Sequence, residues 1–463
     1  MLFFLSAWMP LAAAADPPPA APPVVETPDY PGAIWEPASP ANFQRAHRPS
    51  PQQPIDRIVI HDIEGTAAEA VRWFQNPKAR ASAHYVVEGQ TGRVYQLIKE
   101  RDIAWHAGNR RTNARSVGIE HEGFAYRPGF YNPVEYEASA RLVRAIALRC
   151  DIPRDRTHII GHFEVPNAAH PGRFGGSNGH TDPGPYWDWD YFMALIRNDA
   201  RKETDAVPQP VILHPGETSE AAFTLLNTGD DPWPADPKAE QNADLWGQGP
   251  VYLGAWASGA AWGPSSAFFG PGWVSPRFAA SAAGGEVAPG ASGRFVVPLH
   301  APRDLLGPVT ETFRLFKVPV APRLPVPFGP PLSVSARVEP WDLQVPLPPT
   351  PPPGWASKTL PAGSQAFWCK AAPNPPGPVR WQITLPIGGA WDVYARSAPG
   401  ASRTARAVYQ VTGADTGAET QTVDQRKGGG AWRKLGRFRF GSPPDDDRLG
   451  VPGIRPGASV LSP

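Results

Sequence analysis

Apolar residues recur with two different periods along the chain, and the change of period divides it. Between about residues 42 and 203, short apolar runs are separated by segments with helical spacing. We expect strands there at 55–60, 83–87, 94–97, 117–122 and 158–160, and helices at 66–74, 133–148 and from near Trp189. Strands that alternate with helices predict an α/β domain, in which helices flank a central mixed sheet.

The rest of the chain has no helical period. Short alternating runs separated by Gly and Pro are typical of β-sandwiches. We expect strands first at 222–226, 251–255, 294–299, 312–318 and 332–338, and then at 366–370, 382–385, 391–395, 407–411 and 437–440. The predicted fold is therefore multidomain, with an α/β domain at 42–203, a β-sandwich at 206–340, a Pro-rich linker at 341–362 and a second β-sandwich at 363–463.

The first fifteen residues are apolar and uncharged, and they end in Ala13-Ala14-Ala15, a small-residue pattern typical of signal-peptide cleavage. The run is shorter than the ~20 residues that a spanning helix needs, although a short membrane-embedded anchor is an alternative. No later run is long and apolar enough to span a membrane. A signal peptide at 1–15, followed by a Pro- and Ala-rich tether at 16–41, predicts a secreted or periplasmic protein.

Composition excludes several classes of protein. The 463 residues carry a formal net charge of +1, so no strong field points to nucleic acid or to an acidic membrane. Two Cys cannot staple a chain of this length, and 60 Pro with 45 Gly disfavour a long helical array. We expect Cys150 in the core, without a bridge to Cys369, and we expect the protein to be a monomer.

Histidine is concentrated in the first domain, where eight of the eleven lie between His61 and His180. His61 and His162 each follow an expected strand, Glu120 lies in another, and Asp182 lies in the turn sequence HTDPGP. Strand ends meet at one edge of an open α/β sheet, where such folds assemble their sites. Two imidazoles and a carboxylate can hold a catalytic zinc, and a further carboxylate is then needed to transfer protons.

Each of these residues also has a structural interpretation. A single His beside a strand is more often hydrogen-bonded in the core than bound to a metal. Glu120 could be a buried ion-pair partner, and Asp182-Pro183-Gly184 could be only a turn, since all three are turn-forming residues. The residue types alone leave both interpretations open.

Seven motifs stand in a fixed order along the first domain: IVIH, SAHY, GRVYQL, WHAG, SVGIEHEG, GHFEVP and HTDPGPYWDW. With them, residues of about 55–195 resemble the type 2 N-acetylmuramoyl-L-alanine amidases, the family that includes the peptidoglycan-recognition proteins. The resemblance implies hydrolysis of the amide between the lactyl group of N-acetylmuramic acid and L-alanine of peptidoglycan. It also implies that His61, His162 and Asp182 bind Zn²⁺ and that Glu120 is catalytic.

Two features depart from the family pattern. Many members carry Lys two residues before the aspartate ligand, where this chain has His180. By its position a protonated His180 would stabilise the developing oxyanion. Residues 167–179 look inserted and contain His170, so His170 or His180 is an alternative ligand. In the remaining motifs, we expect His84, Trp105 and His106 to contact the substrate, although His84 could equally pack beneath the metal site.

The later segments carry weaker resemblances. LLNTGDDPW, VAPGASGRFVVPLHAP and FRLFKV make 206–340 similar to an immunoglobulin-like (Ig-like) module with a spacing or attachment role. We expect most of its Trp residues to lie in its core and exposed ones to stack on sugars; these are Trp246, Trp256, Trp262 and Trp273. WDVYARSA, AVYQV and VDQRKGGGAWRKLGRFRF make 363–463 similar to a golvesin/xanthan-lyase carbohydrate-binding-like domain, without a recognisable closing strand after Pro443.

Three functions remain open. The resemblance favours a secreted zinc amidase acting on peptidoglycan, because all four metal and catalytic positions are filled. The alternatives are a recognition protein that binds peptidoglycan without cutting it, and an amidase that acts on small anhydro-muropeptides. The C-terminal β domains would bind other cell-wall polysaccharide.

Overall fold

The computed structural model describes most of the chain. The described residues are 26–207, 211–234, 249–257, 264–303, 305–319, 324–345, 347, 349–359, 365–369, 376–398, 400–427, 430–441 and 457–462. The predicted signal peptide, part of the tether, Trp246 and Trp262 lie outside them. Within the described residues, no helix is long and apolar enough to cross a membrane.

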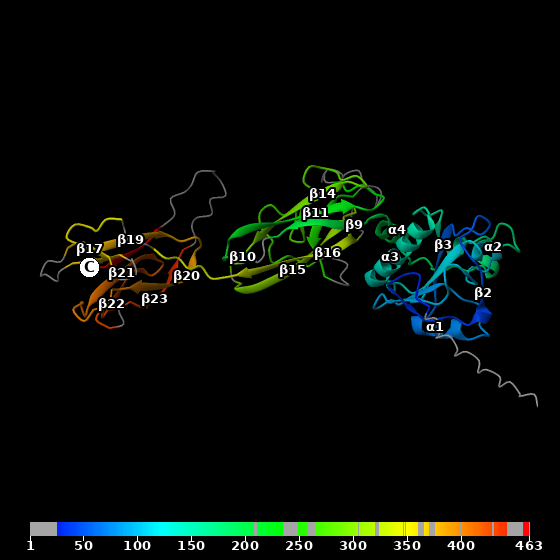
Figure 1. Cartoon of the computed structure of the whole chain (residues 1–463), viewed down its shortest axis with the longest axis horizontal. Helices are drawn as coiled ribbons and strands as arrows, with labels where there is room; N and C mark the ends of the chain where they lie inside the picture. The colour runs from blue at the N-terminus through cyan, green and yellow to red at the C-terminus, as the bar shows by residue number, and fades with distance from the viewer. Residues whose placement is uncertain are drawn as a thin grey trace, which may run out of the picture.

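The described elements gather in three parts that follow one another in chain order (Figure 1). The α-helices of the described chain all lie in the first part, and the elements after Arg197 are strands. The structure therefore confirms a β-rich C-terminal region after the region that contains the helices.

The first part is built on a six-stranded mixed sheet in the order β1-β5-β4-β7-β3-β8. Its strands are β1 (Ala33–Trp35), β3 (Arg57–Asp62), β4 (Tyr85–Val87), β5 (Val94–Gln96), β7 (Ser116–His121) and β8 (Ile159–Gly161), and β2 (Phe43–Gln44) pairs separately with β6 (Ile103–Ala104). Strands β4, β7, β3 and β8 run parallel, so their carboxyl ends meet at one edge.

The helices begin at residues that the sequence marks as caps. Thr66 and Glu69 form a capping box at the start of α1 (Ala67–Gln75), and the Asn132 side chain caps α3 (Pro133–Cys150). Asp188 caps α4 (Trp189–Arg197) in the same way, and Asn109 caps the short α2 (Arg110–Asn113). The caps satisfy backbone N–H groups that have no partner within the helix, so each helix starts at a defined residue.

Alternation along β3 separates the core from the site. Ile58 and Ile60 pack into the core formed with α3 and α4. Val59 points to the other face, where it packs with Ala107, Ile160 and Val165. Because successive side chains of a strand point to opposite faces, His61 lies on the same face as Val59.

The second part contains two sheets that share one core. Their orders are β10-β16-β15-β12-β13 and β14-β11-β9. The strands are β9 (Ala200–Ala206), β10 (Val211–Leu213), β11 (Thr218–Asn227), β12 (Val251–Ala255), β13 (Phe278–Ser281), β14 (Ser292–His300), β15 (Gly307–Lys317) and β16 (Val326–Val338). Trp233, Phe223 and Phe313 fill the space between the sheets, whereas Trp273 is only partly buried against the core. The predicted division at residues 203 and 206 falls within β9, which belongs to this part by its pairing with β11.

The third part is formed by short strands around a smaller core. Its sheets are β19-β24-β21-β22, β20-β23 and β17-β18. The strands are β17 (Ala356–Thr359), β18 (Gln365–Trp368), β19 (Val379–Thr384), β20 (Gly389–Arg396), β21 (Ala407–Ala414), β22 (Gly417–Val423), β23 (Trp432–Phe440) and β24 (Gly457–Ser462). The closing strand that could not be recognised in the sequence after Pro443 is present as β24, which pairs with both β19 and β21. Its residues, GASVLS, are small and only weakly apolar, so the sequence pattern did not reveal it.

Candidate metal centre and catalytic site

Three adjacent strands bring candidate site residues to the carboxyl edge of the sheet. His61 of β3 lies opposite Glu120 of β7 in the parallel register. Ile60 lies opposite Gly161 of β8, so His162, the next residue, reaches the same edge. Strand register thus places two imidazoles and a carboxylate side by side, although they are distant in the sequence.

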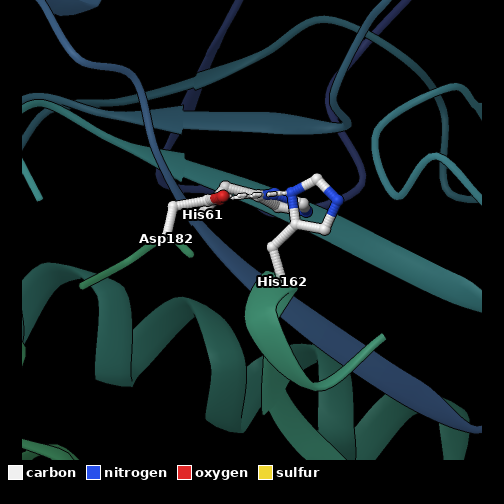
Figure 2. A group of neighbouring side chains, drawn as sticks. All are labelled: His61, His162 and Asp182. Carbon is white, nitrogen blue, oxygen red and sulfur yellow. Dashed lines mark hydrogen bonds and ion pairs between the residues drawn. The ribbon is translucent and has the colours of Figure 1, made fainter. Parts of the chain in front are cut away.

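Asp182 joins the two histidines from the loop that precedes α4 (Figure 2). Its carbonyl accepts a hydrogen bond from the Phe163 amide, which ties the loop to the residue after His162. The Nδ1 atoms of His61 and His162 are 3.1 Å apart, and Asp182 Oδ2 lies 3.2 Å from the first and 3.3 Å from the second. All three side chains are buried.

This triangle fits a tetrahedral metal ion. Bonds of about 2.0–2.2 Å, as zinc makes to His nitrogen and carboxylate oxygen, place tetrahedral ligand atoms about 3.3–3.6 Å apart. The observed separations of 3.1–3.3 Å are close to that range. The Nδ1 atoms of His61 and His162 face each other and the Asp182 carboxylate, so all three ligand atoms can contact one cation placed between them. In the described part of the chain, His61, His162 and Asp182 are the one such group of His, Cys, Asp and Glu.

A hydrogen-bonded chain behind His61 determines which of its nitrogens can bind a metal. His61 Nε2 lies 2.9 Å from His106 Nδ1, His106 Nε2 lies 3.0 Å from Ser116 Oγ, and the Ser116 hydroxyl donates to the Thr112 carbonyl at 2.7 Å. Since Ser116 gives its own proton to Thr112, it accepts from His106 Nε2–H. His106 Nδ1 is then free to accept from His61 Nε2–H, which leaves His61 Nδ1 with the lone pair that faces the triangle.

Gly118 makes room for this chain. A Cβ atom at residue 118 would lie 2.4 Å from the His106 ring. Gly118 is in register with Val59 and lies two residues before Glu120, so it is on the face of β7 that carries the site. The glycine of the SVGIE motif therefore allows His106 to pack directly beneath His61.

Burial and neighbouring charges set the protonation states. Burial, together with the charge of His162, lowers the pKa of His61 to about 4, so its imidazole is neutral, as a metal ligand must be. Burial alone would raise the pKa of Asp182, but the adjacent imidazoles of His162, His180 and His61 hold it well below its usual range. Burial, with the nearby Asp182 and Asp62 carboxylates, raises the pKa of Glu120 well above its ordinary value. A raised carboxyl pKa beside a metal site is typical of a group that transfers protons.

His180 lies at the open side of the triangle. Its ring stacks on that of His162 with 4.2 Å between centroids, and its Nδ1 lies 3.5 Å from Asp182 Oδ1. The hydrogen bond to Asp182 raises the pKa of His180 against the effect of burial. The side chain is exposed, as is His170 in the 167–179 segment, and neither belongs to the buried triangle.

The predicted substrate contacts of His84 and His106 are not supported by their positions. His84 is completely buried, and its Nδ1 accepts from the Gly118 amide. His106 is buried beneath His61, with both ring nitrogens occupied. The alternative that His84 packs beneath the site agrees with its burial. Trp105 remains half-buried, so its expected contact with substrate stays a prediction.

Sequence reasoning missed a tyrosine that links two loops of the site. Tyr131 Oη lies 2.9 Å from Asp62 Oδ2 and 2.8 Å from the Pro183 carbonyl. It thus connects the residue after His61 with the residue after Asp182. No motif marked Tyr131, because it lies in the loop before α3 and reaches both partners only in the folded chain.

Two imidazoles and a carboxylate in one triangle, with a further carboxylate at the same sheet edge, define the class: a candidate mononuclear metallohydrolase site. Comparison with known proteins identifies the family. The family model described as N-acetylmuramoyl-L-alanine amidase matches residues 51–185, and that of the golvesin C-terminal domain matches 355–444. The N-acetylmuramoyl-L-alanine amidase A of Achromobacter lyticus is 33% identical over 177 residues, which are 36% of this chain and 95% of that protein. The chain belongs to the N-acetylmuramoyl-L-alanine amidase family.

Two further similarities were found. The 1,6-anhydro-N-acetylmuramyl-L-alanine amidase AmpD of Haemophilus influenzae is 29% identical over 175 residues, covering 32% of this chain and 86% of its own length. A mutant endolysin from Bacillus subtilis of known structure aligns with 35% of this chain and 97% of its own, at 20% identity and a TM-score of 0.26. The expected resemblances to the amidases and to the golvesin domain are confirmed, whereas the Ig-like character of the middle segment stays a prediction.

Proposed function

We propose that the protein is a zinc-dependent N-acetylmuramoyl-L-alanine amidase that acts on peptidoglycan outside the cytoplasm, as a secreted or periplasmic enzyme. The observation that carries this proposal is the buried triangle of His61, His162 and Asp182, with Glu120 in register beside it, in a chain of the amidase family. The filled Glu120 position favours an enzyme over a protein that only binds peptidoglycan.

The metal ligands would be His61 Nδ1, His162 Nδ1 and the Asp182 carboxylate. Zinc bound there would polarise the scissile carbonyl and make a water molecule more acidic. The chain's own contribution is a preorganised cage: burial keeps His61 neutral, and the Tyr131 hydroxyl holds together the two loops that carry His61 and Asp182. His106 would act as a positioning residue, because it receives the His61 Nε2–H.

Glu120 and His180 would handle the proton and the developing charge. Glu120 would accept a proton from the attacking water and pass it to the nitrogen of L-alanine as the carbon–nitrogen bond breaks. His180, exposed at the open side of the triangle and hydrogen-bonded to Asp182, would donate a hydrogen bond to the oxyanion. Its partial exposure leaves room for a substrate carbonyl.

The reaction changes the charge of the glycan. Water adds across the amide, so one product is the stem peptide with a free amine on L-alanine. The other product is the glycan strand, in which each reacted muramic acid carries a free lactyl carboxylate. The amide that was cut had no charge, so hydrolysis turns a neutral linkage on the glycan into an anionic one.

Digestion of purified sacculi tests the proposal. The full chain should release peptides with free amino-terminal L-alanine, seen by mass spectrometry, and a chelator should abolish release until zinc is added back. Glu120→Gln serves as the matched control, because it should retain zinc without releasing peptide. Undiminished release from zinc-free protein would contradict the metal assignment. Release only from small anhydro-muropeptides would support the alternative substrate, and binding without release in every condition would support a recognition protein.

A further inference from the structure

The outer face of the β20–β23 ribbon in the third part is basic and aromatic. Side chains alternate along β20 and, on either side of a register shift opposite Val393 and Tyr394, along β23. Leu435, Phe438 and Phe440 pack into the core of this part. The opposite face is exposed. Its outward residues are Ala390, Asp392, Tyr394 and Arg396 on β20, and Trp432, Lys434, Arg437 and Arg439 on β23.

Cross-strand pairing sets aromatic rings beside cationic groups. Tyr394 lies opposite Lys434, and Arg396 lies opposite Trp432, so rings and positive charges alternate on a small area. Tyr394 and Trp432 are 48% and 51% exposed, so both rings are accessible from solvent. Successive outward residues of a strand are about 6.6–6.8 Å apart, so the face spans several such steps.

The positive charge of the face is only partly neutralised. Asp392, the one acidic residue among the outward eight, pairs with Lys434 at 2.8 Å. Arg439 lies 4.0 Å from Asp415 in the turn between β21 and β22, and both side chains are largely exposed. Arg396 donates to the Gly430 carbonyl, which does not neutralise it. The face therefore retains cationic groups in a chain whose net charge is only +1.

The outward face of the β21–β22 hairpin provides a contrast within the same part of the chain. Its residues there are uncharged, namely Val408, Gln410, Thr412, Thr420 and Thr422. The basic and aromatic composition of the β20–β23 ribbon therefore does not extend to this neighbouring hairpin. A strand needs alternation only to fill its inner face, so core packing does not account for the choice of basic and aromatic residues outside.

We propose that this face binds the peptide-free glycan strand that the amidase reaction produces, an inference that rests on the proposed function. Aromatic rings such as Tyr394 and Trp432 can stack on the apolar faces of sugar rings. Guanidinium groups such as those of Arg396 and Arg437 match carboxylates in charge and geometry. A glycan with a lactyl carboxylate on each muramic acid presents both features, whereas the uncut amide presents no charge at that position. The face would keep the enzyme on glycan that it has already stripped, close to the remaining substrate.

The test measures binding of the full chain to glycan strands freed of peptide by an unrelated amidase and immobilised through their reducing ends. The protein carries Glu120→Gln, so it does not act on any residual peptide. We expect Arg437→Ala and Trp432→Ala each to weaken binding by about tenfold, the loss typical of one charge-assisted hydrogen bond or buried ring. Thr420→Ala and Thr422→Ala, on the uncharged face, should leave the dissociation constant unchanged. Binding should also weaken steeply with salt.

A chemically matched ligand separates charge from sugar recognition. Capping the lactyl carboxylates as neutral amides with a carbodiimide should weaken binding at least as much as Arg437→Ala does. Equal binding of capped glycan, of neutral chitin oligomers or of single-stranded nucleic acid would overturn the proposal, as would Arg437→Ala and Trp432→Ala variants that bind like the parent. The glycan is prepared without this protein, so failure to bind is distinguishable from failure of the proposed amidase activity, which the sacculus digestion measures.

Discussion

Removing the Glu137 carboxylate should weaken the contact between the first and second parts of the chain. Glu137 lies on α3, and its Oε2 is 2.8 Å from Nη1 of Arg314 on β15. Arg314 also donates to the Gly329 carbonyl, and its guanidinium lies 5.0 Å from the Trp256 ring centroid. Val326 lies on β16, the strand that pairs with β15, and it packs into the core of the first part.

The magnitude follows from burial. The Arg314 and Glu137 side chains are only 9% and 13% exposed. Removing one partner of a buried pair costs about 3–5 kcal/mol, because the other charge stays buried without compensation. Arg314 would keep its bond to Gly329, so we expect the lower end, about 3 kcal/mol for Glu137→Ala. The Lys202–Asp205 pair, about half exposed at 47% and 48%, should contribute less than about 1 kcal/mol.

A double-mutant cycle on the full chain isolates the pair. Glu137→Ala, Arg314→Ala and the double variant would be compared by urea unfolding and by hydrogen exchange of the α3 amides, with Lys202→Ala and Asp205→Ala as the exposed control cycle. Replacing both residues together by Leu and Met should restore most of the lost stability, since no charge is then left buried. A coupling energy no larger than that of the control cycle would refute the reasoning.

Three further predictions concern single residues. Glu120→Gln should retain zinc and lower kcat by ~10²–10⁴, as expected for loss of a general base, and near-normal turnover in a peptide-release assay would show that Glu120 is structural. His180→Ala should lower kcat much more than His180→Lys, because lysine can still donate a hydrogen bond to an oxyanion. Zinc content would be measured in both variants, and loss of zinc from His180→Ala would instead indicate that His180 is a metal ligand. Burial raises the pKa of Glu135, whose carboxylate oxygens have no hydrogen-bond partner, to about 9 from 4.5. Between about pH 4.5 and 9, the native state therefore keeps a proton that the unfolded chain loses. The free energy of unfolding should fall there by up to about 1.4 kcal/mol per pH unit as the pH rises. Glu135→Gln should flatten this slope when stability is measured by urea unfolding. An unchanged slope in that variant would mean that Glu135 is ionised in the folded protein.

Elements that bury a regular apolar face were predictable from the sequence. The helix expected at 133–148 is observed as α3 (Pro133–Cys150), and the strand at 251–255 is observed as β12 with the same limits. By contrast, β9 (Ala200–Ala206) has exposed polar side chains along nearly its whole length. Its strand conformation comes from pairing with β11, so no local pattern could reveal it. For the same reason, the predicted domain boundary at residues 203 and 206 falls within β9.

The contact between the first and second parts was equally beyond sequence reasoning. Arg154, Arg197 and Glu137 have the composition of solvent-exposed helix or loop residues, yet each pairs across to the second part. Complementary charges on surfaces distant in sequence become partners only once both folds exist. A segment cut at 42–203, which the composition marked as a unit, would therefore expose these charges and divide β9.

The motif that contains His106 does not determine where its side chain lies, whereas the geometry of the folded chain does. Its WHAG context marked it as belonging to the site, and the obvious role for a histidine in a site is contact with substrate. Three features of the folded chain instead place the ring beneath His61. Gly118 leaves space for the ring, the register of β7 on β3 places that space under His61, and α2 presents the Thr112 carbonyl that orients Ser116. A motif identifies which residues act together, but the direction of each side chain depends on register and on the smallest residue nearby. Substituting Gly118 should therefore disturb the candidate metal site as much as substituting His106 itself, although glycine has no side chain that could bind metal or substrate.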